Sequence, residues 1–444
     1  MALMIIQPAR RLLGRLRMPG DKSISHRAAL LSALARGRAR IDNFSTSEDC
    51  ARTLECLARL GVSIDRDGAS VLIEGAGIHG LSEPRVALDC GNSGSTMRLL
   101  AGVLAGQEFA SKLTGDHSLL SRPMKRIIEP LERMGARIES NEGHAPLSIQ
   151  GCPSLAAIRY EMPVASAQVK SCIMLAGLLA RGRTSIIEAC GPTRDHTERM
   201  LRWLGLSVSL SESLRQDVPY RTLTLEGPAT FAARDINVPG DISSASFFIA
   251  AASLLSGSEL EINALGLNPT RAQIIQTMQQ FGAEVELDEV SEICHEPVGT
   301  VRVKGRRMRG PLAAARSNML RGALIPQLID ELPVLAVLGT QVDGGLTIRD
   351  ASELRVKESD RIAATVGNLR AMGTEVEEFE DGLRVAGPVR LKGAMLDSLG
   401  DHRIAMAFTV AALLAEGESE LAGAECVGVS FPEFFSLLET VVER

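Results

Sequence analysis

The chain has 444 residues, of which 45% are hydrophobic and 23% charged, and a formal net charge of −6. This length predicts two domains rather than a single hydrophobic core. Aromatic residues make up only 3% of the chain, and together with the acidic net charge this argues against nucleic-acid binding, which needs basic surfaces and stacking platforms. We therefore expect a globular protein that acts on small molecules and has no nucleic-acid partner.

The eight cysteines are scattered and form neither a C-x-x-C pair nor a cluster with histidines at metal-ligand spacing. This pattern is typical of reduced thiols in a cytoplasmic protein and predicts no metal site. The N-terminal stretch MALMIIQPARRLLGRLR carries its basic residues after a short apolar run, which is the reverse of a signal peptide. No segment reaches the roughly 18 apolar residues of a membrane span. We expect a cytoplasmic protein without a membrane partner.

In chain order, one pattern recurs five times: a helix that ends in a hydrophobic residue and a glycine, followed by a short strand. Each glycine stands where a helix C-terminus favours a left-handed backbone. These glycines are Gly61, Gly135, Gly205, Gly282 and Gly373. A sixth, truncated copy, LLETVVER, closes the chain.

A second pattern alternates with the first: a small polar turn, a helix rich in alanine and leucine, a glycine and a strand. The helices begin near PGDKSIS, GNSGST, ASAQVKS, PGDISSA, IDELP and GDHRIA. Because they are apolar nearly all round, we expect buried helices wrapped by sheet. Six such α/β units indicate an internal duplication.

The first copy, PGDKSISHR (19–27), matches the fourth, PGDISSASF (239–247), best of all. This match places the duplication boundary near residues 20 and 240. One domain is expected at 21–240 and the other at 1–20 plus 241–444, with the two PGD turns as hinges.

Cations gather at the starts of the second-pattern helices, where backbone N–H groups and the helix dipole already favour anions. The first start carries Lys22, His26 and Arg27, the second Arg98, and the sixth His402 and Arg403, whereas the fourth start carries none. Three other stretches concentrate charge, namely SRPMKR with Arg122, GPTRDHTER with Arg194, and ELRVKESDR with Lys357, Glu358 and Arg361. A net-acidic chain that gathers cations in this way is expected to bind a small anion. Asp330 and Glu358 are then candidates for proton transfer.

Eight segments, in order and spacing along nearly the whole chain, resemble the 5-enolpyruvylshikimate-3-phosphate (EPSP) synthase family, and most closely its bacterial branch. They are PGDKSISHRA, GNSGSTMR, SRPM, ASAQVKS, TRDHTE, IDELP, ELRVKESDR and DHRIAM. The resemblance implies an inside-out α/β barrel of the enolpyruvyl transferase type, with three β-α-β-α-β-β units in each of two domains that close on substrate. It also implies transfer of the enolpyruvyl group of phosphoenolpyruvate to the 5-hydroxyl of shikimate 3-phosphate, with release of phosphate, in chorismate and aromatic amino-acid biosynthesis. No metal or redox cofactor is implied, and a monomer is expected.

The resemblance also assigns site residues. Contacts to shikimate 3-phosphate are implied for Lys22, Ser23, Arg27, Ser166, Gln168, Arg194, Asp330 and Lys357. Contacts to phosphoenolpyruvate are implied for Lys22, Gly94, Arg122, Gln168, Arg361 and Arg403. Catalytic roles are implied for Asp330, which accepts the 5-hydroxyl proton, for Lys357 beside it, for Glu358, which protonates the methylene carbon, and for Lys22.

The chain departs from the family pattern at two positions. Ala167 stands where many members have a second serine, and Val429 stands where many have a lysine, so neither contact is expected here. Gly94 lacks the methyl group found in many glyphosate-tolerant members, which implies at most moderate sensitivity to that inhibitor.

Three other functions fit parts of the sequence, and one of them, an enzyme that acts on nucleic-acid ends and is built on related repeats, is disfavoured by the acidic net charge and the scarcity of aromatic residues. An enolpyruvyl transferase acting on UDP-N-acetylglucosamine shares the fold but uses a loop cysteine, and the corresponding loop TGDHSLLSRPM has none. A non-catalytic binding protein on the same scaffold is expected to lack the set Asp330, Lys357 and Glu358, and all three are present.

Overall fold

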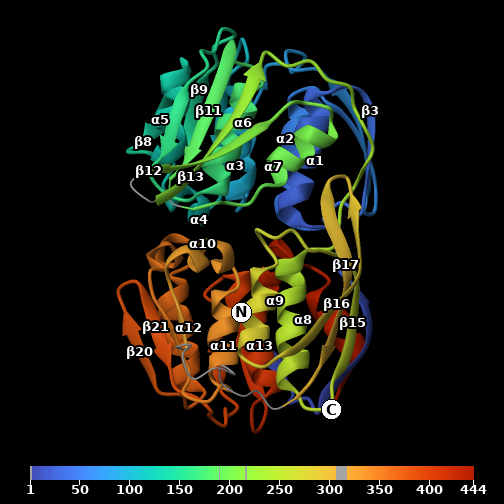
Figure 1. Ribbon diagram of the computed structural model, residues 1–444, viewed down its shortest axis with the longest axis vertical. Helices are drawn as coiled ribbons and strands as arrows, with labels where there is room; N and C mark the ends of the chain where they lie inside the picture. Colours follow the sequence, from blue (N-terminus) through green and yellow to red (C-terminus); the bar gives the residue numbers. More distant parts are fainter. Residues whose placement is uncertain (1–2, 190, 216–217, 307–317) are drawn as a thin grey trace. The chain divides into compact units, whose positions relative to one another are not determined.

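The computed structural model describes residues 3–189, 191–215, 218–306 and 318–444. The chain divides into two compact units, which are described separately (Figure 1). Unit 1 consists of Met1–Pro19, Pro239–Glu292 and Pro297–Arg444, and unit 2 consists of Gly20–Val238 and Ile293–Glu296.

Unit 2 is built from seven helices and twelve strands within the described residues. The helices are α1 (Lys22–Leu34), α2 (Glu48–Arg59), α3 (Gly94–Leu104), α4 (His117–Ser121), α5 (Lys125–Met134), α6 (Ala167–Gly177) and α7 (His196–Trp203). The strands are β3 (Arg36–Asp42), β4 (Ser63–Asp67), β5 (Ser70–Ala76), β6 (Leu88–Asp89), β7 (Ala110–Thr114), β8 (Arg137–Asn141), β9 (His144–Gln150), β10 (Arg159–Met162), β11 (Gly182–Glu188), β12 (Ser209–Arg215), β13 (Val218–Gly227) and β14 (Ile236–Asn237).

Unit 1 repeats this plan. Its helices are α8 (Ile242–Leu254), α9 (Gln273–Gln280), α10 (Ile325–Leu328), α11 (Leu332–Gly339), α12 (Arg361–Ala371), α13 (His402–Leu413) and α14 (Phe434–Val441), with short 3₁₀ turns η1 (Gly322–Leu324), η2 (Ser352–Val356) and η3 (Ala424–Val429). Its strands are β1 (Leu3–Ile6), β2 (Arg11–Arg17), β15 (Glu259–Gly266), β16 (Glu284–Ile293), β17 (Glu296–Lys304), β18 (Met319–Leu320), β19 (Leu346–Ile348), β20 (Val376–Phe379), β21 (Gly382–Val385), β22 (Met395–Asp397), β23 (Ser419–Ala422) and β24 (Val442–Glu443). The tip between β16 and β17 is counted with unit 2.

The sheets repeat one pairing scheme. In unit 2 the strand orders are β14-β3-β5-β4, β6-β7-β9-β8 and β10-β11-β13-β12. Each sheet begins with a parallel pair and continues with two antiparallel pairs. The sheet β18-β19-β21-β20 of unit 1 follows the same scheme, and β1-β23-β22 is a shorter version. The structure therefore shows the repeats that the sequence predicts.

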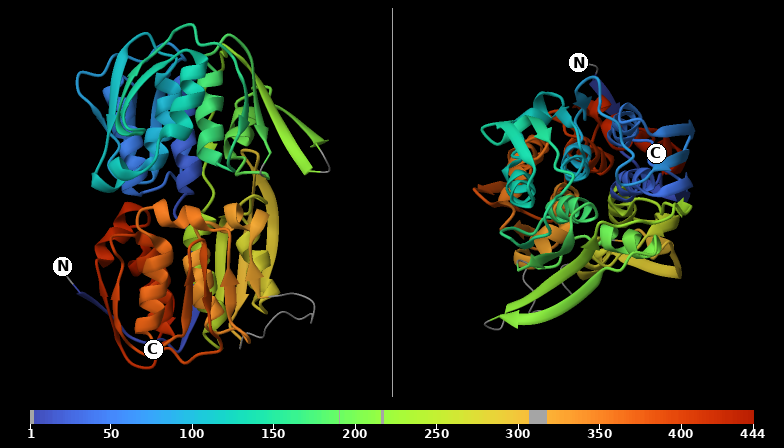
Figure 2. Two further views of the ribbon diagram at one scale, coloured as in Figure 1. Left: turned by 90° about the vertical axis from the view of Figure 1, so that its left-hand side faces the viewer. Right: turned by 90° about the horizontal axis from the view of Figure 1, so that it is seen from above.

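The alanine-rich helices lie inside the units. Nearly every residue of α1, α3 and α6 in unit 2, and of α8, α11 and α13 in unit 1, is buried. Figures 1 and 2 show the sheets on the outside of these helices, so each unit has its helices at the centre. Each unit has its own hydrophobic core. Burying a leucine or isoleucine in such a core stabilises the fold by roughly 1.5–3 kcal/mol.

Local signals at the helix ends behave as predicted. All five C-terminal glycines have positive φ, for example 112° at Gly135 and 83° at Gly205. At the central helix starts the capping side chains accept backbone N–H groups, as Asp21 does from Ile24 at 2.9 Å and Ser93 from Thr96 at 3.1 Å. The helix starts are therefore fixed by local chemistry, and their charged side chains are set at defined positions.

The tip of the β16–β17 hairpin, residues 293–296, packs within unit 2. His196 Nδ1 lies 2.7 Å from Glu296 Oε1, and both side chains are buried. Arg199 donates to the carbonyl oxygen of His295 at 2.8 Å, and the ring of His295 packs edge-on against Trp203. Nothing in the sequence pattern singled out this connection between distant segments.

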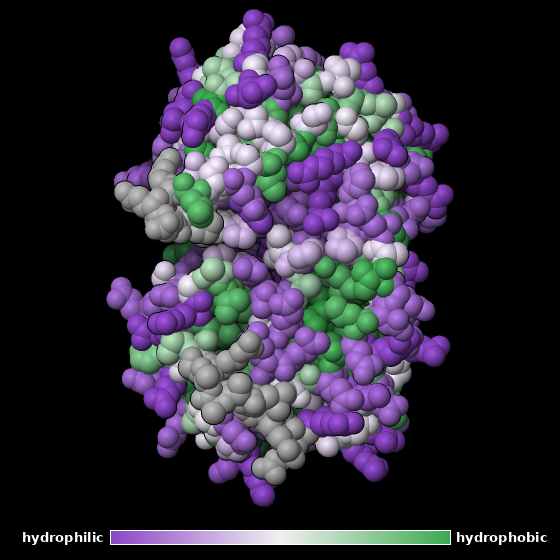
Figure 3. Space-filling view, viewed as in Figure 1, coloured by the Kyte–Doolittle hydropathy of each residue, from purple (hydrophilic) through white to green (hydrophobic). Residues whose placement is uncertain are grey.

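Hydrophilic side chains cover most of the face shown in Figure 3. Among the described residues, no single helix has both the length and the hydropathy of a membrane span. Two helical segments, Gly322–Leu328 and Leu332–Gly339, pass that test only in combination, and they meet at 111°.

Candidate active site

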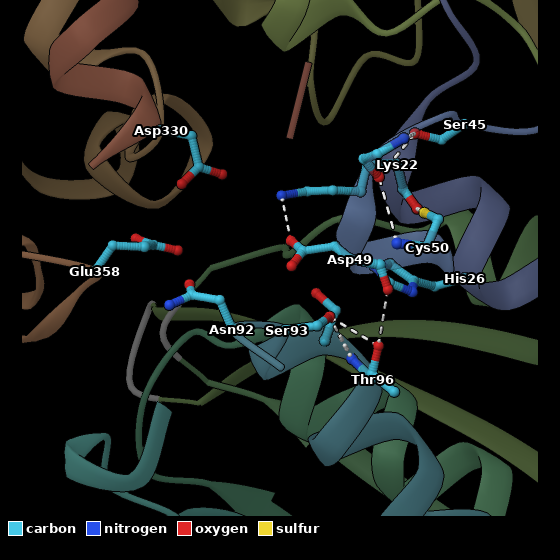
Figure 4. Close-up of polar contacts among 12 residues, drawn as sticks. Lys22, His26, Ser45, Asp49, Cys50, Asn92, Ser93, Thr96, Asp330 and Glu358 are labelled. Carbon is cyan, nitrogen blue, oxygen red and sulfur yellow. Dashed lines mark hydrogen bonds and ion pairs between the residues drawn. The ribbon is translucent and has the colours of Figure 1, made fainter. Parts of the chain in front are cut away.

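Lys22 opens α1 and pairs with an aspartate from the next helix. Its Nζ lies 2.8 Å from Asp49 Oδ2, and the two side chains are 17% and 10% exposed (Figure 4). Asp21 caps the same helix, and Ser23 follows Lys22 with its side chain half-buried. The α1 start therefore combines a helix dipole, a capping carboxylate and a lysine that keeps some access to solvent.

Arg27 lies one turn further along α1 and is held on three sides. Its Nε donates to Thr197 Oγ1 at 2.7 Å, its Nη2 to Ser171 Oγ at 2.8 Å, and its Nη1 to the carbonyl oxygen of Ser23 at 2.7 Å. Since Ser171 lies on α6 and Thr197 on α7, this arginine depends on three helices for its orientation.

His26 corrects the sequence analysis, which counted it among the cations. Burial, reinforced by the positive charges of Lys22 and Arg27, lowers the pKa of His26 from 6.5 to about 3. The ring is therefore neutral at pH 7. Its Nδ1 lies 2.7 Å from Thr53 Oγ1, which in turn bonds Thr96 Oγ1 at 2.7 Å. His26 thus helps to join α1, α2 and α3 and contributes no charge to an anion site.

At the start of α3 two arginines approach the backbone closely. A Cβ atom added at Gly94 would lie 3.0 Å from Arg98 Nη1 and 3.4 Å from Arg122 Nη1. Arg122 is buried in an extended conformation before Pro123, as predicted, and its Nη2 donates to Asn92 Oδ1 at 2.7 Å. Gly94 is therefore a position where the absence of a side chain leaves room beside two guanidinium groups.

Ser166 and Gln168 occupy the start of α6. Ser166 is the N-cap, and its Oγ accepts from the backbone N–H of Val169 at 3.4 Å. Gln168 Oε1 accepts from Arg98 Nη1 at 2.6 Å, while its Nε2 donates to Ser95 Oγ at 2.9 Å. The α3 and α6 starts are thereby linked, and the orientation of the Gln168 amide is fixed by its two partners.

Arg194 stands on the segment between β11 and α7, directly after Thr193 and before Asp195, the N-cap of α7. Its side chain is half-buried. With Lys22, Ser23, Arg27, Gly94, Arg122, Ser166 and Gln168, it completes the predicted positions carried by unit 2.

In unit 1, Arg361 is the centre of a carboxylate cluster. Its Nε donates to Asp401 Oδ2 at 2.7 Å and its Nη2 to Glu358 Oε2 at 2.6 Å. Its Nη1 lies 3.4 Å from Asp330 Oδ1. Figure 4 shows the Asp330 and Glu358 side chains on neighbouring segments of unit 1. The structure therefore brings both predicted proton-transfer residues to one guanidinium group.

The charge of Arg361 is fixed by this cluster. Burial by itself lowers the pKa of the guanidinium, but Asp401, Glu358 and Asp330 outweigh burial, so the pKa of Arg361 is raised above its ordinary value. Lys357 lies beside the same group, with its Nζ 4.0 Å from Asp330 Oδ1 and 3.6 Å from Glu353 Oε1. Asp330 thus lies between two cations.

Arg403 lies at the start of α13 and is buried. Its backbone N–H donates to Asp401 Oδ1 at 2.8 Å, so Asp401 ties the positions of Arg361 and Arg403 together. Among the described residues its Nη1 is buried with no hydrogen-bond partner. A buried guanidinium nitrogen without a partner is costly unless a ligand supplies the acceptor, and this supports an anion site beside α13.

Sequence reasoning missed the residues that hold the predicted ones. They include Asp49, Asn92 and Asp401, which bond Lys22, Arg122 and Arg361 respectively. Asp401 lies in the DHRIAM segment. Its position at a helix start, directly before two basic residues, was the sequence feature that could have identified it as a partner of the site residues. Asp49 and Asn92 carried no pattern that linked them to their partners.

Val429 closes η3, which packs against α13.

The two units have a repeated α/β structure, and cations and carboxylates are concentrated at the starts of their buried helices. This combination is typical of enzymes that act on small anions. Comparison with known proteins narrows the class to transferases. The family model described as EPSP synthase (3-phosphoshikimate 1-carboxyvinyltransferase) matches residues 6–438, and the chain belongs to this family.

Curated relatives agree along the whole chain. A 3-phosphoshikimate 1-carboxyvinyltransferase of Koribacter versatilis (strain Ellin345) is 50% identical over 440 residues, which cover 99% of each chain. One of Synechococcus sp. (strain JA-3-3Ab) is 47% identical over 446 residues, covering 99% of this chain and 97% of that relative. The EPSP synthase structure from Acinetobacter baumannii superposes with a TM-score of 0.84 at 38% identity, covering 99% of this chain and 98% of that one. The predicted family, fold and transferase class are confirmed, and the UDP-N-acetylglucosamine alternative is not favoured.

Proposed function

We propose that the protein transfers the enolpyruvyl group of phosphoenolpyruvate to the 5-hydroxyl of shikimate 3-phosphate and releases phosphate. The observation that carries the residue assignment is the Arg361 cluster, because one buried guanidinium bonds to both Asp330 and Glu358. A reaction that moves one proton off a hydroxyl and one onto a carbon needs two such groups beside a bound anion.

Unit 2 carries most of the proposed shikimate 3-phosphate contacts. Lys22, Ser23 and Arg27 bind from α1, Ser166 and Gln168 from α6, and Arg194 from the segment before α7. Planar guanidinium groups and helix N-termini suit both the phosphate and the carboxylate of this substrate. Because Arg27 and Gln168 are already held by protein partners, little side-chain ordering remains to oppose binding.

Phosphoenolpyruvate is proposed to bind Arg122, Arg361 and Arg403, with Lys22 and Gln168 in contact with both substrates and Gly94 leaving room beside Arg122. The substrate supplies an acceptor for Arg403 Nη1, which has no hydrogen-bond partner in the part of the chain that the structure describes. Asp401 already accepts hydrogen bonds from Nε and Nη2 of Arg361. The Nη1 atom makes only a long contact of 3.4 Å with Asp330. Nη1 is therefore the nitrogen that is proposed to bind the substrate.

The proposed reaction transfers two protons and involves no oxidation or reduction. Asp330, with Lys357 beside it, accepts the 5-hydroxyl proton as that oxygen attacks C2 of phosphoenolpyruvate. Glu358 delivers a proton to C3, giving a tetrahedral ketal that retains the phosphate. Loss of a methyl proton back to Glu358 then expels phosphate and leaves the enolpyruvyl ether, while the proton held by Asp330 passes to the departing phosphate, so that both carboxyl groups return to their starting protonation states.

The test is phosphate release from phosphoenolpyruvate by purified protein, with shikimate 3-phosphate in one reaction and UDP-N-acetylglucosamine in another. Release with shikimate 3-phosphate alone is expected. Release with the nucleotide sugar alone, or silence in both reactions from folded protein, would refute the proposal.

The roles are separated by substitution. Asp330→Ala is expected to lower turnover by about 10²-fold or more while shikimate 3-phosphate still binds. Arg122→Ala is expected mainly to raise the KM for phosphoenolpyruvate. Near-normal turnover of the Asp330 variant removes that residue from the mechanism, and an effect of Arg122→Ala on shikimate 3-phosphate binding alone contradicts the pocket assignment.

A further inference from the structure

A fully buried ion cluster lies behind the α6 start and has no part in the proposed chemistry. Lys170, one turn after the N-cap Ser166, has its Nζ 2.6 Å from Glu198 Oε1 and 3.1 Å from Glu188 Oε1. Glu188 ends β11 and Glu198 lies in the first turn of α7. The cluster thus joins three separate elements of unit 2.

The cluster is a poor device for stability alone. One lysine faces two carboxylates, and all three side chains are at most 3% exposed. Burial raises the pKa of Glu198, although Lys170 opposes that shift, and among the described residues Glu198 Oε2 has no hydrogen-bond partner. Replacing such buried ions with apolar residues is often neutral or stabilising. A geometric role explains their presence better.

Thr193 connects the cluster to the segment that carries Arg194. Its backbone N–H donates to Glu188 Oε1 at 2.9 Å, and its hydroxyl donates to the same oxygen at 2.6 Å. Its carbonyl oxygen accepts from Lys170 Nζ at 3.3 Å. Three polar groups of one residue are therefore fixed by the cluster, immediately before Arg194.

The same elements hold Arg27. Ser171 and Thr197, the neighbours of Lys170 and Glu198 in sequence, bond each other at 2.7 Å and both accept from Arg27. The ion pair and this hydroxyl pair are adjacent links between α6 and α7. The spacing of these two helices therefore sets the position of a second proposed substrate contact.

We propose that Lys170 and Glu188 are positioning residues for shikimate 3-phosphate binding, which act through Thr193 on Arg194. This inference rests on the proposed function, since it takes Arg194 as a contact to that substrate. Lys170 and Glu188 touch no substrate themselves. They fix the backbone ahead of Arg194, so that this segment does not have to be ordered when the substrate binds.

The decisive variant is Thr193→Val, which removes the hydroxyl donor to Glu188 and keeps the β-branched shape. We expect the Kd for shikimate 3-phosphate, measured by calorimetry, and its KM to rise about tenfold, with kcat and the KM for phosphoenolpyruvate unchanged. The matched control is Thr184→Val in the same unit, because Thr184 Oγ1 is buried and has no partner among the described residues. Unchanged binding in Thr193→Val, or an equal change in Thr184→Val, overturns the proposal.

A double-mutant cycle tests the route through Arg194. Arg194→Ala alone is expected to weaken shikimate 3-phosphate binding roughly 30-fold. If Thr193 acts through Arg194, adding Thr193→Val to Arg194→Ala causes no further loss. Losses that multiply show that Thr193 acts independently, and that result overturns the proposal.

The failure of the proposed function is distinguishable from the failure of this inference. If the unaltered protein does not bind shikimate 3-phosphate, both are wrong. If it binds and turns over but Thr193→Val behaves like the unaltered protein, only the positioning role is wrong. Hydrogen exchange of residues 191–195 gives a readout independent of activity: faster exchange in Thr193→Val supports the anchoring of the segment, and unchanged exchange contradicts it.

Discussion

The starts of α1 and α8 share one backbone design and differ in how charge is used. Both begin with Pro-Gly-Asp, and the aspartate caps the helix in each case. Asp21 Oδ1 accepts from Ile24 at 2.9 Å and Asp241 Oδ1 from Ser243 at 2.8 Å. Ile242 then stands at the position of Lys22, and Phe247 at that of Arg27.

A cation from another segment lies at the α8 start, although the sequence of that start has none. Arg271, from the segment before α9, donates to Ser243 Oγ at 2.5 Å and lies 3.4 Å from Asp241 Oδ1. Ser243 in turn donates to Glu331 Oε1. Arg271, Ser243 and Glu331 are all buried. The α8 start is therefore occupied by an internal ion network, whereas Lys22 keeps partial access to solvent.

A cation near a helix start is therefore not enough to make a ligand site. The polar groups at that start must also remain available, and not be taken up by partners within the protein. Ser23 and Ser243 are equivalent in sequence, yet Ser243 is consumed by two protein partners. Substitutions at the two starts should therefore have different consequences, the first for activity and the second for stability.

The largest expected effect is that of Lys22→Ala, which removes a charged donor proposed to contact both substrates. We expect kcat/KM to fall about 10³-fold, or about 4 kcal/mol, measured as phosphate release. Lys112, exposed on β7, provides the control variant Lys112→Ala, which should behave normally. A fall in kcat/KM of less than tenfold in Lys22→Ala would contradict the proposed difference between the two helix starts.

The next effect concerns stability. Arg271→Ala leaves the buried Asp241 carboxylate without its cationic partner and removes a donor to Ser243, so we expect the free energy of unfolding to fall by about 3 kcal/mol, measured by urea denaturation. Arg40→Ala serves as the control, because the Arg40–Asp42 pair at 2.8 Å is exposed at 60% and 47% and such pairs contribute little. Equal stability of the two variants would contradict the internal-network interpretation.

A smaller effect should appear as a pH dependence. The folded-state pKa of His26, about 3, lies below its ordinary 6.5, so between these values the unfolded chain binds a proton that the folded chain does not. Stability therefore falls as the pH drops below 6.5, by about 2 kcal/mol from this residue at pH 5. His26→Asn should flatten the curve of unfolding free energy against pH, and the exposed His79→Asn should not. Parallel curves for all three proteins would show that His26 is not buried as a neutral ring.

The smallest effect is expected from adding a cation to unit 1. Val429→Lys places an ammonium group in η3, which packs against the helix carrying Arg403. We expect the KM for phosphoenolpyruvate to fall about threefold, less than 1 kcal/mol, because an added charge at a half-buried site is screened by water. Val86→Lys, at an exposed position of unit 2, is the control and should leave the KM unchanged.

Sequence reasoning captured what is local. Helix caps such as Asp21, left-handed glycines such as Gly135 and the burial of apolar helices depend on a few neighbouring residues, and the repeats made them visible. The family motifs located Asp330, Glu358 and Arg361, which the structure brings together. The α1 motif also led to an error at His26, because a sequence shows an ionisable group but not its burial.

Partners from distant segments could not be predicted. Glu331 and Ser243 are 88 positions apart, and Arg27 and Thr197 are 170 apart. Lys170 lies in a largely apolar helix, and nothing local distinguishes a buried, doubly paired lysine from an exposed one. Such contacts depend on how the sheets and helices of a unit pack, and no local periodicity encodes that packing.

The hairpin tip at residues 293–296 has a consequence for dividing or recombining the gene. A fragment encoding 20–238 would omit Glu296, the partner of His196, and the carbonyl group of His295 that receives Arg199. Unit 2 produced in this way would expose a buried histidine at the first turn of α7, beside the segment that carries Arg194. A chimera that exchanges the units of two relatives should therefore transfer this four-residue tip together with unit 2, although it is encoded between two segments of unit 1.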